Sequence, residues 1–113
     1  MIDSFSFGRM SIDGRSFTSD LMIFPDGRVE DGWWRKQGHR LKKSDLERLV
    51  AASPEIIIAG CGVHGMMRPD PELAGWLKDE GIDFFAASNA EAVKKFNASR
   101  THRPSAACFH LTC

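Results

Sequence analysis

The residues most able to do chemistry lie in one short loop, Gly60-Cys61-Gly62-Val63-His64-Gly65, after a run of isoleucines. Its G-x-G-x-x-G spacing is that of dinucleotide-binding folds, where backbone amides meet a pyrophosphate at the start of a helix. Here Met66-Met67-Arg68-Pro69 separates the loop from the next capping residue, Asp70. The following strand ends in Ala86-Ala87-Ser88-Asn89 rather than at an acidic residue that could bind ribose. The pattern argues against a dinucleotide and favours a glycine-rich turn.

The alternative hypothesis for the same loop is that it binds a smaller ligand. Loop amides and helix N-termini meet at the carboxyl edge of a parallel sheet, where open α/β folds place their ligands. This alternative predicts a concave pocket with free backbone amides and a nearby cation. The candidate residues for a small anionic or polar ligand are Gly60, Cys61, Gly62, His64, Gly65, Arg68 and Asn89.

Two further functions of the cysteines and histidines, catalysis and zinc binding, have only weak support in the sequence. Cys61 with His64 could form a nucleophile and base, but the sequence supplies no orienting carboxylate at a known spacing. Adding His110 and Cys113 suggests zinc, yet neither pair has a two-cysteine knuckle. We therefore predict no metal site, no cofactor and no catalytic residue. The three cysteines are too few and odd in number for a disulfide framework, which favours a reducing compartment.

The second dense stretch surrounds two adjacent tryptophans. In a strand, Trp33 and Trp34 face opposite sides, so one can be core while the other is near the surface. Tryptophan and arginine are the residue types most common in protein-interface hot spots. We predict Trp33, Trp34, Arg35 and His39 as candidate interface residues. The narrowly favoured interpretation is instead one core tryptophan and one that covers the hairpin, with the basic residues solvated. The interface comes second, and base stacking on the aromatic is a distant third.

Length and charge restrict the classes of protein. The 113 residues fit a single domain over 1–113, and the formal net charge is zero. No basic field attracts nucleic acid, and no polybasic tract favours a membrane surface. The N-terminal residues lack a signal-peptide pattern, and no apolar run is long enough to span a bilayer. We expect a cytoplasmic protein without nucleic acid or membrane insertion.

The first third of the chain alternates apolar and polar residues with strand periodicity. We predict a bulge at Gly8-Arg9, where the alternation slips by one residue, and a hairpin turn at Asp13-Gly14. A second strand is expected to carry Phe17, Leu21 and Ile23 on one face. A third is expected over Val29 to Trp34, completing an antiparallel meander.

Helical signals then alternate with strand signals. Ser44 and Glu47 have capping-box spacing, and Asp70-Pro71 suggests a helix that Gly81 ends. Ser88 or Asn89 caps a third helix. Buried strands are expected over Glu55 to Ala59, Ile82 to Ala87 and Ala106 to Thr112. The predicted order is β-β-β-α-β-α-β-α-β, with one parallel βαβ unit over 55–87.

Several segments together resemble a known family. They are SFGR-x-x-IDG, SDL-x-IFPD, WWRK-x-GH, the glycine loop and the terminal HLTC. The chain resembles the small α/β domain of unknown function that includes the adipogenesis-associated domain protein and NADH dehydrogenase (complex I) assembly factor 3. The matching positions are Gly8, Arg9, Trp33, Trp34, Arg35, His39, Gly60, Gly62, Gly65, His110 and Thr112.

The resemblance implies an α/β fold made of three layers in a single domain, with a mixed central sheet and an added β layer. It does not by itself imply an enzyme activity, and one branch of the family suggests protein–protein contact. We therefore expect a non-enzymatic protein-binding or assembly-factor-like module with an unknown protein partner, itself a monomer or weak homodimer. The alternative is the small-ligand protein that uses the Gly60–Gly65 loop.

Overall fold

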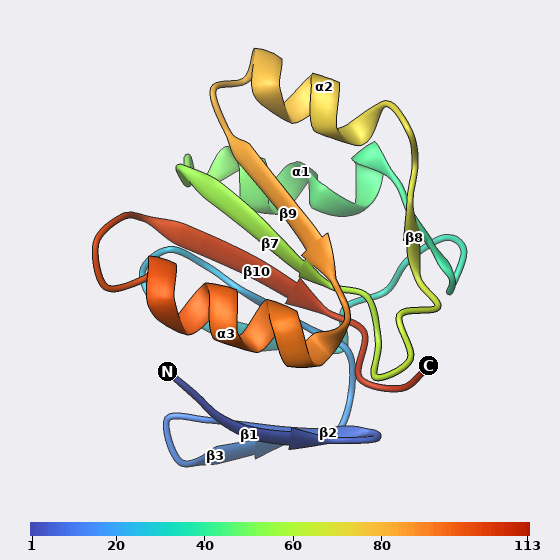
Figure 1. Cartoon of the computed structure of the whole chain (residues 1–113), viewed down its shortest axis with the longest axis vertical. Helices are drawn as coiled ribbons and strands as arrows, with labels where there is room; N and C mark the ends of the chain where they lie inside the picture. Colours follow the sequence, from blue (N-terminus) through green and yellow to red (C-terminus); the bar gives the residue numbers. More distant parts are fainter.

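A five-stranded mixed sheet forms the centre of the molecule. The computed structural model describes all residues, 1–113 (Figure 1). The strand order is β5-β4-β10-β7-β9, with β10 parallel to β7 and antiparallel to β4. The bounds are β4 Leu21–Ile23, β5 Val29–Asp31, β7 Ile56–Gly60, β9 Asp83–Ala87 and β10 Ser105–Phe109. Strands β7 and β10 are buried along their whole length, which explains why their sequences are apolar throughout.

The two faces of the sheet are covered by different elements. Helices α1 (Lys43–Ala51) and α2 (Leu73–Asp79) pack on one face, where Leu46, Leu49, Leu73 and Leu77 join one core cluster. Helix α3 (Asn89–Ser99) lies on the other face, and so does a separate three-stranded sheet. In Figure 1 this outer sheet lies below the central sheet, with α3 beside it. The predicted three-layer α/β domain with a mixed sheet and an added β layer is confirmed.

The outer sheet is the predicted antiparallel meander, with one correction. Its strands are β1 (Ile2–Ser6), β2 (Arg9–Ile12) and β3 (Arg15–Phe17). The expected hairpin turn at Asp13-Gly14 is present, with both residues at positive φ. The phase slip at Gly8-Arg9 is a hairpin turn rather than a bulge, because Ser6 pairs directly with Arg9. Gly8, at φ +78, makes that turn possible.

The second predicted strand is two strands in two sheets. Phe17 ends β3 in the outer sheet, whereas Leu21 and Ile23 belong to β4 in the central sheet. All three side chains nevertheless enter the same core cluster. The apolar pattern therefore identified the buried face correctly, although it could not show the change of sheet at Thr18–Asp20. The third strand, expected to reach Trp34, ends at Asp31.

Two helices begin at other residues than predicted. Helix α1 starts at Lys43, and the carboxylate that caps it is that of Asp45, whose Oδ2 accepts the Lys42 amide at 2.8 Å. Ser44 and Glu47 are therefore not the capping pair. Helix α2 starts at Leu73, because the Asp70 carboxylate pairs with Arg40 instead of capping it. Helix α3 follows Ser88, as predicted.

A short pair of parallel strands, which the sequence did not predict, holds the loop after β7 in place. Strands β6 (Arg40–Leu41) and β8 (Arg68–Pro69) pair side by side. The Arg68 amide donates to His39 O at 2.8 Å, and the Asp70 amide donates to Leu41 O at 2.9 Å. These bonds tie the segment after the tryptophans to the segment after the glycine loop. The predicted βαβ unit is present as β7-α2-β9 with parallel strands.

Candidate functional site

Most amides of the glycine loop are already occupied by the protein itself. Cys61 N donates to Ala87 O at 2.8 Å, and Val63 N donates to Thr112 O at 2.7 Å. The Gly62 amide donates to Asn89 Oδ1 at 3.1 Å. The remaining loop bonds run from Gly65 N to Gly62 O, from Met66 N to Cys113 O and from Met67 N to Cys61 O. None of the three surface pockets is lined by the loop. The expectation of free amides in a concave pocket is therefore wrong.

Two glycines of the loop are required by close packing. A Cβ at Gly60 would overlap the ring of Phe109 and the side-chain oxygen of Asn89. A Cβ at Gly62 would overlap the backbone of Cys113, and its φ of +106 also favours glycine. Gly65 has a positive φ but open space around it. The G-x-G-x-x-G spacing thus reflects a turn where chain segments cross closely.

The other ligand candidates of the loop do not converge on one site. Cys61 is 5% exposed, and burial raises the pKa of its thiol to about 11, so it is not a thiolate near neutral pH. His64 is exposed and lies against Phe7, with ring centroids 6.2 Å apart. Arg68 is exposed on β8. The thiol and imidazole therefore do not form the nucleophile and base that the spacing suggested.

Asn89 joins three chain segments at the carboxyl ends of the parallel strands. Its side-chain oxygen accepts the Gly62 amide, and its Nδ2 donates to His110 O at 2.9 Å. Its backbone amide donates to Gly62 O at 3.1 Å. The residue is fully buried, and its polar groups are used within the protein. Asn89 therefore fastens the loop to β10 and is not available to a ligand.

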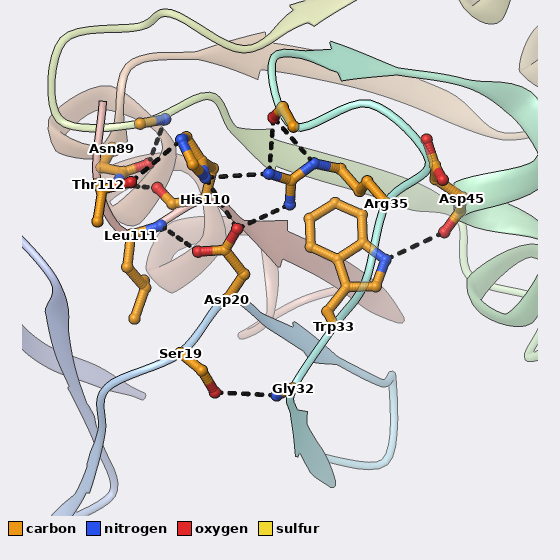
Figure 2. Close-up of polar contacts among 12 residues, drawn as sticks. Ser19, Asp20, Gly32, Trp33, Arg35, Asp45, Asn89, His110, Leu111 and Thr112 are labelled. Atoms are coloured by element: carbon orange, nitrogen blue, oxygen red, sulfur yellow. Dashed lines mark hydrogen bonds and ion pairs between the residues drawn. The ribbon is translucent and has the colours of Figure 1, made fainter.

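A buried charged network lies next to this junction and is drawn in Figure 2. Asp20 Oδ2 accepts from Arg35 Nη1 at 2.8 Å and lies 2.8 Å from His110 Nδ1. Asp20 Oδ1 accepts the Leu111 amide at 2.8 Å. Arg35 also donates through Nη2 and Nε to Gly38 O, at 2.7 and 3.2 Å. The network links the start of β4, the segment after Trp34 and the end of β10.

The short contact between Asp20 and His110 fixes the tautomer of the imidazole. At 2.8 Å the carboxylate needs a proton on Nδ1, because two lone pairs would repel at that distance. Arg35 Nη2 lies 3.0 Å from the same Nδ1 and also donates to Gly38 O at 2.7 Å. Nε2 then accepts from Thr112 Oγ1 at 3.3 Å. The ring of His39 packs edge-on against His110, with centroids 5.6 Å apart.

The acidity of Asp20 reflects the network around it. Burial by itself raises the pKa of this carboxyl, but hydrogen bonds from His110, the Leu111 amide and Arg35 outweigh that effect. The pKa of Asp20 consequently lies below its ordinary value. The carboxylate remains charged at neutral pH and balances Arg35, whose side chain is only 4% exposed.

The four interface candidates separate into buried and exposed residues. Trp33 is 8% exposed, donates from Nε1 to Asp45 O at 3.3 Å and stacks under the Arg35 guanidinium. Arg35 is buried too, so its prediction as an interface residue is wrong. Trp34 is 78% exposed, and His39 is exposed at the neighbouring turn. The expectation that one tryptophan is core and the other lies at the surface is confirmed.

An open groove of about 490 Å³ lies next to Trp34, between β5 and the start of α1. Its lining mixes carboxylates, cations and the edge of the buried tryptophan: Met22, Glu30, Asp31, Gly32, Trp33, Trp34, Lys36, Ser44, Asp45 and Arg48. Arg48 and Glu30 pair with each other across it. The groove is shallow and mixed in charge, which suits a protein surface better than a small buried ligand.

Asp20 is the residue of the network that sequence reasoning missed. It lies in the stretch Ser19-Asp20-Leu21, whose only signal is a charged residue at the start of an otherwise apolar strand. No group of three or more His, Cys, Asp or Glu side chains is placed to hold a metal ion. No helix is long and apolar enough to cross a membrane.

These features define a three-layer α/β domain. At the carboxyl ends of its parallel strands, the polar groups bond mainly to other parts of the same chain. The chain belongs to the family of proteins of unknown function DUF498/DUF598, whose model matches residues 2–110. The conserved hypothetical protein PH1505 from Pyrococcus horikoshii is similar, with a TM-score of 0.85 and 26% identity, covering 100% of this chain and 99% of that one. The protein MT938 is similar at a TM-score of 0.82 and 28% identity, covering 100% and 98%.

A Mth938-like domain protein from Bordetella pertussis has a TM-score of 0.73 and 17% identity over 97% of this chain and 84% of that one. This likeness concerns the fold alone. The fold agrees with the family resemblance that the sequence motifs indicated.

Proposed function

We propose that this domain is a non-enzymatic protein-binding module of the assembly-factor kind, and that its contact surface centres on Trp34. The observation that carries the proposal is the exposure of this side chain, 78%, between two neighbours that are both buried. Trp33 and Arg35 are held in the interior by hydrogen bonds and by their stacking on each other. The backbone of Trp34 is therefore fixed, and its indole is presented outward on a rigid segment.

The energetics favour a partner for this indole. A tryptophan buries about 150–250 Å² when covered. At about 25 cal/mol per Å², covering Trp34 contributes about 4 kcal/mol before the costs of association. The adjacent groove supplies Lys36, Asp31 and Ser44 as polar groups around the aromatic. An exposed aromatic anchor with a polar rim is the usual composition of an interface hot spot.

The geometry gives less support to chemistry on a bound substrate. Most of the loop amides are used internally, and the pKa of the Cys61 thiol is raised. His110 is enclosed by Asp20, Arg35, Thr112 and His39. These contacts favour a structural role for the polar residues of the carboxyl edge.

The test compares Trp34→Ala with Phe7→Ala, which removes another exposed aromatic, 58% exposed, from a different surface. The proteins carry a photo-crosslinking residue in place of Lys36, and their crosslinked partners are identified after nuclease treatment. We expect Trp34→Ala to lose the wild-type partner by tenfold or more (about 1.4 kcal/mol) while Phe7→Ala keeps it. Both variants should melt within a few degrees of the wild type. Equal recovery by both would refute the proposal.

A further inference from the structure

Strand β9 has an open edge. It is the outer strand of the central sheet, and only β7 pairs with it. The amide of Asp83 donates to Glu55 O at 2.9 Å, and Ala87 O accepts the Cys61 amide at 2.8 Å. The register continues one-to-one between these ends, so Asp83, Phe85 and Ala87 bond to β7. The N–H and C=O groups of Phe84 and Ala86 consequently point away from the sheet.

This edge lacks the features that usually block strand pairing. Its sequence, Asp83-Phe84-Phe85-Ala86-Ala87, has no proline, no lysine and no bulge. Its single charge, Asp83, sits at the start and pairs with Arg103 at 3.0 Å. Ala86 is exposed, and Phe84 and Phe85 are half-buried.

Two other outer strands, β5 and β1, have features that disfavour strand pairing. Strand β5, at the opposite edge of the same sheet, has three residues, and two of them, Glu30 and Asp31, are acidic. Strand β1 has a register irregularity between Ile2 and Ser4. Among the long strands, β9 alone combines a regular edge with a nearly uncharged sequence. The contrast within one molecule marks this edge as a pairing surface.

We propose that β9 pairs antiparallel with β9 of a second copy, about a two-fold axis that passes beside Phe85. Phe84 then faces Ala86 of the partner subunit, and each pair exchanges its two outward hydrogen bonds. Because the axis repeats the pair, the two subunits share four main-chain hydrogen bonds. The central sheets join into one continuous sheet across both copies.

The side chains fit the same register. Phe85 faces Phe85 of the partner subunit at a non-hydrogen-bonded position, where cross-strand side chains are closest and aromatic pairs stabilise a sheet. On the opposite face, large Phe84 lies beside small Ala86 of the partner subunit, so the two faces do not clash. One strand supplies both halves of this match, as a two-fold interface requires. This self-complementarity favours a second copy over an unrelated strand.

The association is weak because the edge is short and one cation lies near the axis. Lys95 Nζ is 5.4 Å from the Phe85 ring centroid, so two copies bring two ammonium groups toward each other. Glu91, one turn earlier on α3, offers each lysine a partial counter-charge. We expect a dimer that forms over about 10 µM to 1 mM, at the small end of specific interfaces.

The test is sedimentation equilibrium of the whole protein with two proline variants. Ala86→Pro removes an outward amide and leaves the β7 ladder complete, since proline is tolerated where the N–H faces solvent. Asp31→Pro removes the corresponding outward amide at the β5 edge and is the matched control. We expect the wild type and Asp31→Pro to dimerise alike. Ala86→Pro should raise the dissociation constant about tenfold or more, since two interface bonds are lost.

Three results would overturn the inference. They are a wild type that stays monomeric up to about 1 mM, an unchanged Ala86→Pro variant, and equal losses in both proline variants. Thermal melting confirms that each variant is folded. Trp34→Ala should dimerise like the wild type, because Trp34 lies beyond β5 at the opposite edge of the sheet. Loss of partner binding and loss of dimerisation are thereby tested by separate variants.

Discussion

Replacing Asp20 with asparagine tests the buried charged network with the smallest change in shape. The carboxylate accepts three hydrogen bonds, from Arg35, His110 and the Leu111 amide. An amide can accept at one atom only. In its better orientation the oxygen faces Arg35 and His110, and the NH₂ group then opposes the Leu111 amide. The variant loses one main-chain hydrogen bond and leaves a buried guanidinium without a counter-charge.

The magnitude follows from these two losses. An unsatisfied buried donor costs about 1–3 kcal/mol, and a broken buried charge pair costs about 3–5 kcal/mol when a partner is removed entirely. Asparagine keeps part of the pairing, so we expect a loss of about 3 kcal/mol in the free energy of unfolding at pH 7. The measurement is urea unfolding. The control is Asp26→Asn, where the exposed carboxylate caps only the Arg28 amide and the cost should stay under about 0.5 kcal/mol.

The pH dependence gives a second, independent readout. The folded pKa of Asp20 lies below its unfolded value, so its stabilisation is complete above the unfolded pKa of about 3.9. It declines as the pH falls through the folded pKa. The difference between wild type and Asp20→Asn should therefore be constant near neutral pH and shrink below about pH 4. A cost under about 0.5 kcal/mol at pH 7, or a difference that does not shrink in acid, would refute the reasoning.

Three other outcomes are expected from the same edge of the sheet. Gly62→Ala should cost more than about 2 kcal/mol in urea unfolding, because a Cβ overlaps Cys113, whereas Gly65→Ala should cost about 1 kcal/mol from its positive φ alone; equal costs would contradict the packing argument. Asn89→Ala should lose about 2–3 kcal/mol, measured likewise, since it leaves the Gly62 amide and His110 O unpaired. In timed alkylation with mass spectrometry at pH 7.5, Cys113 should react well before Cys61, whose thiol is buried and has a raised pKa; faster reaction at Cys61 would show an open loop.

Local signals predicted the fold well because most elements are encoded within a few residues. Alternation identified the outer sheet, and continuous apolar runs identified β7 and β10. Where prediction failed, a distant residue decided the outcome. Asp70 does not cap α2, because Arg40 takes its carboxylate. No local sequence pattern shows that Arg40 competes with the helix for this carboxylate.

The candidate site shows the same limit more strongly. A glycine motif near a helix start resembles a phosphate loop, and only the three-dimensional partners of its amides show otherwise. Asn89 and Thr112 O take two of those amides, and neither residue is near the loop in sequence. Arg35 looked like a surface cation because its partner, Asp20, lies on the far side of the β4–β5 hairpin in the sequence. The prediction that one of the adjacent tryptophans is buried and the other exposed was correct, although β5 ends at Asp31, before both of them.

The position of β10 has a consequence for the order of folding. This strand, the last along the sequence, lies between β4 and β7, with Phe109 opposite both Leu21 and Gly60. During synthesis, β4 and β7 therefore have no strand to pair with between them until residues 105–109 have been made. Closing such long loops is slow, and the transition state must bring distant segments together at once. We expect refolding in the millisecond-to-second range, and intermediates whose two half-sheets expose apolar edges to one another.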